Sequence, residues 1–270
     1  MGNPNGLGEY LRIRRGLVRP GDVGIPVGQE VRRVQGLRRE EVAILAGIST
    51  EYYLRLEQGR ETHPSDQVLR ALARALQLDG PSTAYLWDLV HAAELVPVRA
   101  GGAADGDVQT LIDSWTGTAA VVHNRYLDVL ATNALARELS PNYRVGVNNL
   151  VSLLTDPADR AFHEDWEGLS ARSTALLRSM IGHRAGDARL AALVAELSAA
   201  STSFREAWER NDVTSSTAGV HVLRHPRAGR LVLRFVRLPV PDTDGHTIWT
   251  YHAEPGTPSA AALSSLLPAS

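Results

Sequence analysis

The stretch from residue 36 to residue 60, GLRREEVAILAGISTEYYLRLEQGR, holds two short helical patterns separated by one glycine. In the first pattern Val42, Leu45 and Ala46 recur at helical spacing. Gly47 follows, and glycine suits the position just past a helix end because it adopts positive φ without strain. Ser49 is a good N-cap for the next helix. Two helices joined by so short a turn predict a helix-turn-helix.

The second helix of this motif has an outward face that is polar, aromatic and cationic, since Tyr53 and Leu56 are expected to face inward. Such a face suits a groove of base edges and phosphates. A helical hairpin in an unrelated bundle is the alternative. Thr50 and Arg55 are expected to contact bases, and Arg39 and Arg60 to contact phosphates. The full predicted DNA-binding set is Arg38, Arg39, Ser49, Thr50, Glu51, Tyr52, Arg55, Gln58 and Arg60.

This motif resembles the XRE family of lambda-repressor-like DNA-binding domains. The string LRREEVAILAGISTEYYLRLEQGR is similar in particular to the MmyB-like branch, whose members join that domain to a C-terminal PAS-like ligand-binding domain. LDVLATNALAR, RLAALVAELS, FREAWERNDV and YHAEPGTPSAAAL are similar to the same branch, so the resemblance covers nearly the whole chain. It implies a multidomain chain with an all-α lambda-repressor-like helix-turn-helix domain followed by an α+β PAS-like domain.

Composition along the chain predicts the domain boundaries. Residues 1–95 read as the DNA-binding domain, with five helices around one core. Residues 96–107, VPVRAGGAADGD, are small and glycine-rich, which marks a linker. Residues 108–270 form the ligand-binding or dimerisation domain, in which strand-like stretches flank a long helical region and helices are expected on one side of a sheet.

One ion pair is expected inside the first domain. Arg14 aligns with the family position that pairs with a glutamate near the end of the recognition helix, which here is Glu57. A partly buried Arg–Glu pair would hold the two helices in one orientation, although its net stability is small. Two unrelated surface charges are the alternative.

Charge supports a local nucleic-acid interface. The formal net charge is -2, but ten arginines against six acids fall between Tyr10 and Arg60.

The chain has no lysine and no cysteine, so disulfides and thiolate metal sites are excluded. No run approaches the roughly 18 apolar residues of a membrane span, and the first residues show no signal peptide. A cytoplasmic protein without a membrane partner is therefore expected.

Catalytic and metal chemistry find no support in the sequence. No nucleophile elbow, phosphate loop or dinucleotide fingerprint is present. His221 and His225 fall in a predicted strand, where residues four apart lie about 13 Å from each other, too far to share one ion. Neither a metal site nor a cofactor is expected, apart from a possible bound fatty acid.

The resemblance implies that the C-terminal domain holds a small apolar, fatty-acid-like molecule in a mostly apolar pocket. Ordinary core packing is the alternative for the aromatic residues. Asn133, Arg137 and Arg234 are candidate polar anchors, with a surface salt bridge the alternative for either arginine. The predicted pocket set is Val122, Leu130, Asn133, Arg137, Phe162, Trp166, Leu177, Phe204, Trp208, Arg234, Phe235 and Tyr251.

The expected function is that of a transcriptional regulator that binds double-stranded operator DNA as a homodimer and senses a small apolar ligand. In one alternative the C-terminal domain only dimerises. In another the chain is an enzyme that carries a DNA-binding module, but the missing catalytic set speaks against it. The ligand, the operator, the sign of regulation and the dimer interface do not follow from the sequence.

Overall fold

The computed structural model describes residues 6–26, 34–91, 106–181, 187–214 and 216–267. The chain forms two compact units, one around the N-terminal helices and one around a β-sheet, and each is described by itself. Most of the predicted linker lies outside the described residues, so the boundaries at 95 and 108 stay predictions. Gly106 and Asp107, its last two residues, already belong to a helix.

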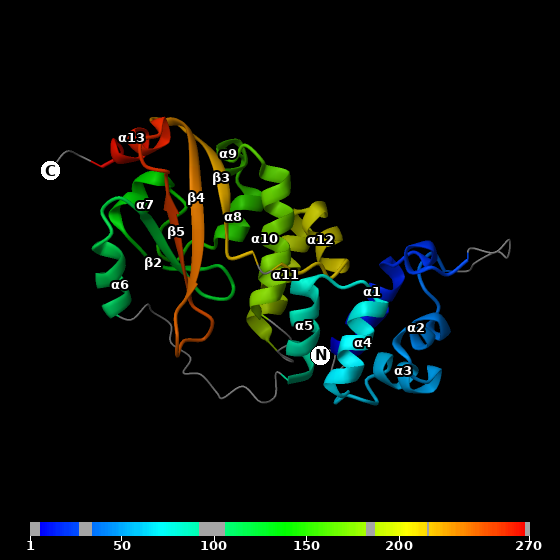
Figure 1. Cartoon of the computed structure of the whole chain (residues 1–270). Helices are drawn as coiled ribbons and strands as arrows, with labels where there is room; N and C mark the ends of the chain where they lie inside the picture. Colours follow the sequence, from blue (N-terminus) through cyan, green and yellow to red (C-terminus); the bar gives the residue numbers. More distant parts are fainter. Residues whose placement is uncertain (1–5, 27–33, 92–105, 182–186, 215, 268–270) are drawn as a thin grey trace. The chain divides into compact units, whose positions relative to one another are not determined.

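The N-terminal unit contains the predicted helix-turn-helix (Figure 1). Gly47 ends the first helix of the motif with φ of 66°, and the Ser49 hydroxyl accepts a hydrogen bond from the Tyr52 amide at 3.1 Å at the start of the second. Its elements are α1 (Gly6–Leu17), a 3₁₀ helix (Pro20–Val23), α2 (Arg39–Ala46), α3 (Thr50–Glu57), α4 (Asp66–Ala75) and α5 (Gly80–His91). The all-α prediction for this domain is confirmed.

The core of this unit is built from one face of each helix. Its largest fully buried side chains are Tyr10, Leu11, Leu37, Tyr53, Leu56, Leu69, Leu72, Leu76 and Leu86. Leu45 is not among the buried residues, because α2 buries the stripe Val42, Ala43 and Ala46, and Leu45 lies at its edge with 38% of its surface exposed. The small Ala43 lets neighbouring helices approach closely.

The C-terminal unit is built on a five-stranded antiparallel sheet in the order β2-β1-β5-β4-β3 (Figure 1). The strands are β1 (Ala119–His123), β2 (Val129–Thr132), β3 (Ala218–His225), β4 (Gly229–Pro239) and β5 (Thr247–His252). Val121 pairs with Trp249, and Trp249 with Arg237. Since paired residues share a face, one face of the sheet carries these three side chains.

Helices cover both faces of this sheet. On the face of Val121, the core contains side chains of α7, Tyr143 and α13. On the opposite face, Ile112 of α6 packs with Ala120, Val122 and Ile248. The helices after residue 105 are α6 (Gly106–Asp113), α7 (Ala134–Leu139), α8 (Asn149–Thr155), α9 (Pro157–Phe162), α10 (Trp166–Ile181), α11 (Ala188–Ala200), α12 (Thr202–Glu209) and α13 (Pro258–Ser264). The start of α11 up to residue 191 and residues 206–214, which include the end of α12, belong to the N-terminal unit. The predicted α+β class is confirmed. The prediction that helices cover only one side of the sheet was wrong, because both faces of β1 are apolar and each needs a covering layer.

Candidate nucleic-acid interface and ligand cavity

The outward face of α3 is exposed as the sequence predicted. Thr50, Glu51, Arg55 and Gln58 are exposed, and Tyr52 is half-buried. The Arg55 guanidinium lies 5.6 Å from the centroid of the Tyr52 ring, a cation–π distance that steadies the long side chain. This face therefore presents a hydroxyl, an acid, an amide and a cation within two helical turns.

The remaining predicted DNA-binding residues lie around the two helix starts and the end of α3. Arg38 precedes α2, and its backbone amide donates a hydrogen bond to Oε2 of Glu41 at 2.6 Å. Ser49 caps α3, and Arg60 is exposed just after it. Arg38 and Ser49 therefore define helix starts, and Arg60 lies exposed just beyond the end of α3.

The predicted ion pair of Glu57 forms with a different arginine. Nε of Arg15 donates to Oε1 of Glu57 at 2.7 Å, and Nε of Arg39 donates to Oε2 at 2.6 Å. Arg14, one helical position earlier, points its guanidinium toward Tyr10, 6.0 Å from the ring centroid. The prediction was wrong by one residue, because successive helical residues point about 100° apart. Arg39 takes part in this pair through Nε while its side chain stays 46% exposed, so its phosphate contact remains a prediction.

The pKa of the buried Glu57 carboxylate agrees with these two ion pairs. The carboxylate side chain is 1% exposed. Burial by itself raises its pKa, but the hydrogen bonds and charges of Arg15 and Arg39 outweigh burial and hold the pKa below its ordinary value of 4.5. Arg15 also donates from Nη1 to the backbone oxygen of Leu37 at 2.8 Å. One buried carboxylate thus links α1, α2 and α3 behind the exposed face.

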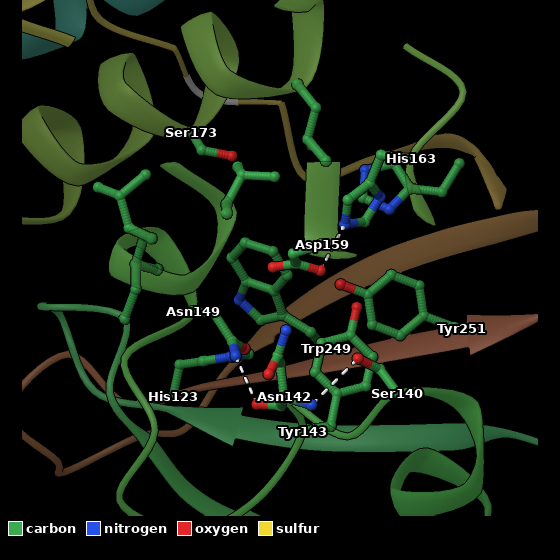
Figure 2. Close-up of a pocket in the computed structure, with 15 residues that line it drawn as sticks. His123, Ser140, Asn142, Tyr143, Asn149, Asp159, His163, Ser173, Trp249 and Tyr251 are labelled. Atoms are coloured by element: carbon green, nitrogen blue, oxygen red, sulfur yellow. Dashed lines mark hydrogen bonds and ion pairs between the residues drawn. The ribbon is translucent and has the colours of Figure 1, made fainter. Parts of the chain in front are cut away.

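The C-terminal unit contains a cavity between the sheet and the helices α8, α9 and α10 (Figure 2). The space within it is about 500 Å³, part of it open to solvent. Leucines, aromatic rings and neutral polar groups share the wall. The lining residues are His123, Leu127, Ser140, Asn142, Tyr143, Asn149, Leu150, Leu153, Asp159, His163, Leu169, Ser173, His221, Trp249 and Tyr251.

His123 is held at one end of the cavity by a chain of hydrogen bonds. Its Nε2 lies 2.6 Å from Oδ1 of Asn149, whose Nδ2 donates to the backbone oxygen of Asn142 at 2.7 Å. The imidazole packs on Trp249 with ring centroids 4.8 Å apart. Burial lowers the pKa of His123 to about 4, so the ring is neutral near pH 7.

The opposite end is formed by His163, His221, Asp159 and two tyrosines. Nε2 of His163 lies 3.4 Å from Oδ1 of Asp159. The His221 ring stacks on Tyr251 with centroids 5.7 Å apart, and Tyr251 stacks on Tyr143 at 5.5 Å. Burial lowers the pKa of His221 to about 4 and raises that of Tyr251 to about 12. The stacked rings are therefore uncharged near pH 7.

A second hollow adjoins this end. It shares His163, Leu169 and His221 with the cavity and continues to exposed residues that include Asp165 and Arg172. The shared residues therefore line both spaces.

The predicted polar anchors lie elsewhere. Asn133 is a buried N-cap of α7: its Oδ1 accepts from the amides of Ala120 and Ala136, both at 3.0 Å, and its Nδ2 donates to three backbone oxygens. Arg137 donates to the backbone oxygen of Thr132 at 2.7 Å, and Arg234 pairs with Glu254 at 3.2 Å on the surface. All three have structural partners.

Of the predicted pocket set, only Tyr251 lines the cavity. Val122 and Leu130 belong to the cluster on the α6 face of the sheet. Phe162 and Phe235 lie outside the lining against histidines, Phe162 on His163 and Phe235 on His221. Trp166 donates from Nε1 to the backbone oxygen of Leu153 at 2.7 Å. The others, Leu177, Phe204 and Trp208, are buried or half-buried on α10 and α12. Sequence analysis had selected the large apolar residues, which fill the core.

Most of the cavity residues that were missed are polar, and the others are Leu127, Leu150, Leu153, Leu169, Tyr143 and Trp249. His123 ends a strand whose five residues are all buried, and His221 shares a strand face with Leu223. A histidine on the apolar face of a strand is a signal that sequence analysis had considered only for metal binding. Among the described residues no group of three or more acidic, cysteine or histidine side chains is placed to hold a metal ion.

A helix-turn-helix with an exposed polar recognition helix, followed by an α+β unit with a cavity, defines the class of two-domain DNA-binding regulators. Residues 104–267 match the family model of the MmyB-like transcription regulator ligand binding domain, and residues 7–86 match that of a helix-turn-helix domain. The chain belongs to the family of MmyB-like transcription regulators. It is thus a DNA-binding transcription regulator with a ligand-binding domain.

The search of curated proteins found no match. In the part of the chain that the structure describes, every helix is too short or too polar to cross a bilayer.

Proposed function

We propose that this regulator binds operator DNA as a homodimer and that a small, largely apolar molecule of the fatty-acid-like class, held in the cavity, changes its affinity for the operator. The observation that carries the proposal is the cavity itself, because it lies within the matched ligand-binding domain and has a partly leucine-lined wall.

Dimerisation follows from the size of the DNA-binding unit. One recognition helix of eight residues reads only a few base pairs, and two half-sites about one helical turn apart supply the rest of an operator. Light scattering at micromolar concentration tests this directly. A monomer that still protects an inverted repeat would contradict it.

Coupling between ligand and DNA depends on differential binding. The ligand changes operator affinity only to the extent that it binds the DNA-competent and DNA-free states differently. A coupling of about 1–3 kcal/mol, or roughly 5- to 150-fold in affinity, is expected. A catalytic activity is not part of the proposal, since the domains are those of a transcription regulator.

The test is a set of operator titrations by fluorescence anisotropy, with and without fatty acids and other apolar probes. Leu153→Trp fills the cavity and should abolish the response. Leu111→Trp, on an α6 residue that is 46% exposed, is the matched control. If a probe shown by calorimetry to bind the wild type and not Leu153→Trp leaves the titration unchanged, the sensor function is wrong, and the domain serves dimerisation.

A further inference from the structure

The recognition helix α3 turns one row of side chains directly away from the core of its unit. Its buried residues are Tyr53, Leu56 and Glu57. Because successive residues point about 100° apart, the opposite side of the helix is centred on Glu51 and Arg55, which are four positions apart and both exposed. Thr50, at the first helical position, lies on the flank of this row. Glu51 and Arg55 are therefore the charged side chains of α3 that meet a DNA groove laid against the helix.

The guanidinium of Arg55 lies beside an aromatic ring rather than beside the acid. It is 5.6 Å from the centroid of the Tyr52 ring, and in the described part of the chain it forms no ion pair with Glu51. A glutamate four residues before an arginine on a helix lies within reach of it, so the ring and not the acid restrains this cation. A cation–π contact is not a hydrogen bond, so Arg55 keeps its donors and Glu51 its acceptors.

A carboxylate at the centre of a DNA-binding face costs affinity for every sequence, because the phosphates repel it. In the major groove, guanine and thymine present only acceptors to it, and adenine sets the acceptor N7 beside its amino group, whereas cytosine presents the amino group N4 alone. Glu51 therefore matches cytosine. Arg55 only donates, so it matches guanine, which presents the two acceptors O6 and N7 side by side. The alternative for Glu51 is an acid that only stabilises the first turn of α3 through the helix dipole.

We propose that the operator of this regulator contains a guanine read by Arg55 and, within about two base pairs of it, a cytosine read by Glu51. The spacing follows from the helix, since four residues rise about 6 Å and successive base pairs lie about 3.4 Å apart. The Tyr52 ring acts as a positioning group that holds the Arg55 side chain toward the bases. The inference rests on DNA binding by the N-terminal unit, and it depends neither on a ligand in the cavity nor on a homodimer.

The test is selection of bound sequences from a library of random duplexes by the full-length protein and its variants. Arg55→Gln should change the preferred base at one position from guanine to adenine, because a glutamine amide matches N6 and N7 of adenine. Glu51→Gln should change cytosine to adenine at a second position, within about two base pairs of the first. Fluorescence anisotropy on the selected duplex and its single-base substitutions should show wild-type preferences of about 5- to 150-fold at each position.

Two matched controls make the same chemical changes away from this row. Glu40→Gln removes an exposed acid of α2, and Arg70→Gln removes an exposed arginine of α4. Both should leave the selected sequence as in the wild type, although Glu40→Gln should strengthen binding to all sequences alike, because it removes one negative charge. Arg55→Lys should keep the guanine, since a lysine also donates to O6 and N7.

If Glu51→Gln selects the wild-type sequence, the cytosine contact is wrong and the acid serves only the helix dipole. If Arg55→Gln selects it, the guanine contact is wrong. Altered positions much further apart than about two base pairs would overturn the placement of both residues in one row. A variant that binds too weakly for selection is titrated on the wild-type duplex and its substitutions, where an unchanged base preference overturns its assignment. None of these outcomes bears on the ligand response, which the operator titrations with apolar probes decide separately.

Discussion

Arg15 on α1 and Glu57 at the end of α3 form a buried ion pair, with Nε of the arginine 2.7 Å from Oε1 of the glutamate. The same carboxylate binds Arg39 on α2. The recognition helix is therefore fixed from behind by charge as well as by the apolar core. Its outward face is free of these contacts, so orientation and recognition depend on different residues.

Arg15→Ala should destabilise the N-terminal unit by about 2–4 kcal/mol, because it leaves a buried carboxylate with one of its two arginines. Arg14→Ala is the matched control. Arg14 lies 6.0 Å from the Tyr10 ring centroid and 3.7 Å from Oδ1 of the partly exposed Asp212, and since such pairs contribute little, its loss should cost less than about 1 kcal/mol. Hydrogen exchange of the α1 and α3 amides in the full chain measures the loss of stability in each variant. Equal losses in the two variants would contradict the assignment of the ion pair to Arg15.

Thr50→Ala and Arg55→Ala should relax base discrimination, since both side chains project from the exposed face of α3 and a good base contact is worth about 1–3 kcal/mol. Arg60→Ala should weaken all sequences alike and reduce the salt slope by about 1. Titrations on operator and scrambled DNA at several salt concentrations distinguish the two effects. An unchanged specificity ratio in Arg55→Ala would count against base contact.

Asn133→Ala should lower the stability of the C-terminal unit by about 2–4 kcal/mol, because it removes an N-cap and a set of buried hydrogen bonds. The affinity for a molecule that binds in the cavity should stay as in the wild type, since Asn133 does not line the cavity. Urea unfolding measures the stability, and isothermal titration calorimetry measures the affinity. A lower affinity with unchanged stability would restore Asn133 as a ligand anchor.

Stability of the C-terminal unit should fall as the pH drops from about 6.5 to about 4. Burial lowers the pKa of His123 and of His221 to about 4 in the folded state, whereas the unfolded chain takes up the protons near the ordinary value of 6.5. Stability is thus complete above 6.5 and lost toward 4, by up to about 3 kcal/mol for each histidine. His123→Gln should flatten the curve of melting temperature against pH, and an unaltered slope would show that His123 is not the titrating group.

The sequence by itself determined the local elements. The helix-turn-helix follows from Gly47, the Ser49 cap and an apolar stripe, all within one short stretch, because capping and helical periodicity act between near neighbours. The alternation of inward and outward side chains along the strands and the exposed face of α3 also follow from the spacing of near neighbours. The α+β class came from the resemblance and from these patterns together.

Only the tertiary structure decided which arginine pairs with Glu57 and which residues enclose the cavity. A shift of one residue on α1 turns a side chain by about 100°, and no local pattern fixes which one faces α3. The cavity joins His123, His221 and Trp249 from three strands, and it depends on strand register and on the helices that cover that face. Large apolar residues were expected there, but they packed into the core because burying them removes the most surface from water, and the space left over is walled largely by polar and ring side chains.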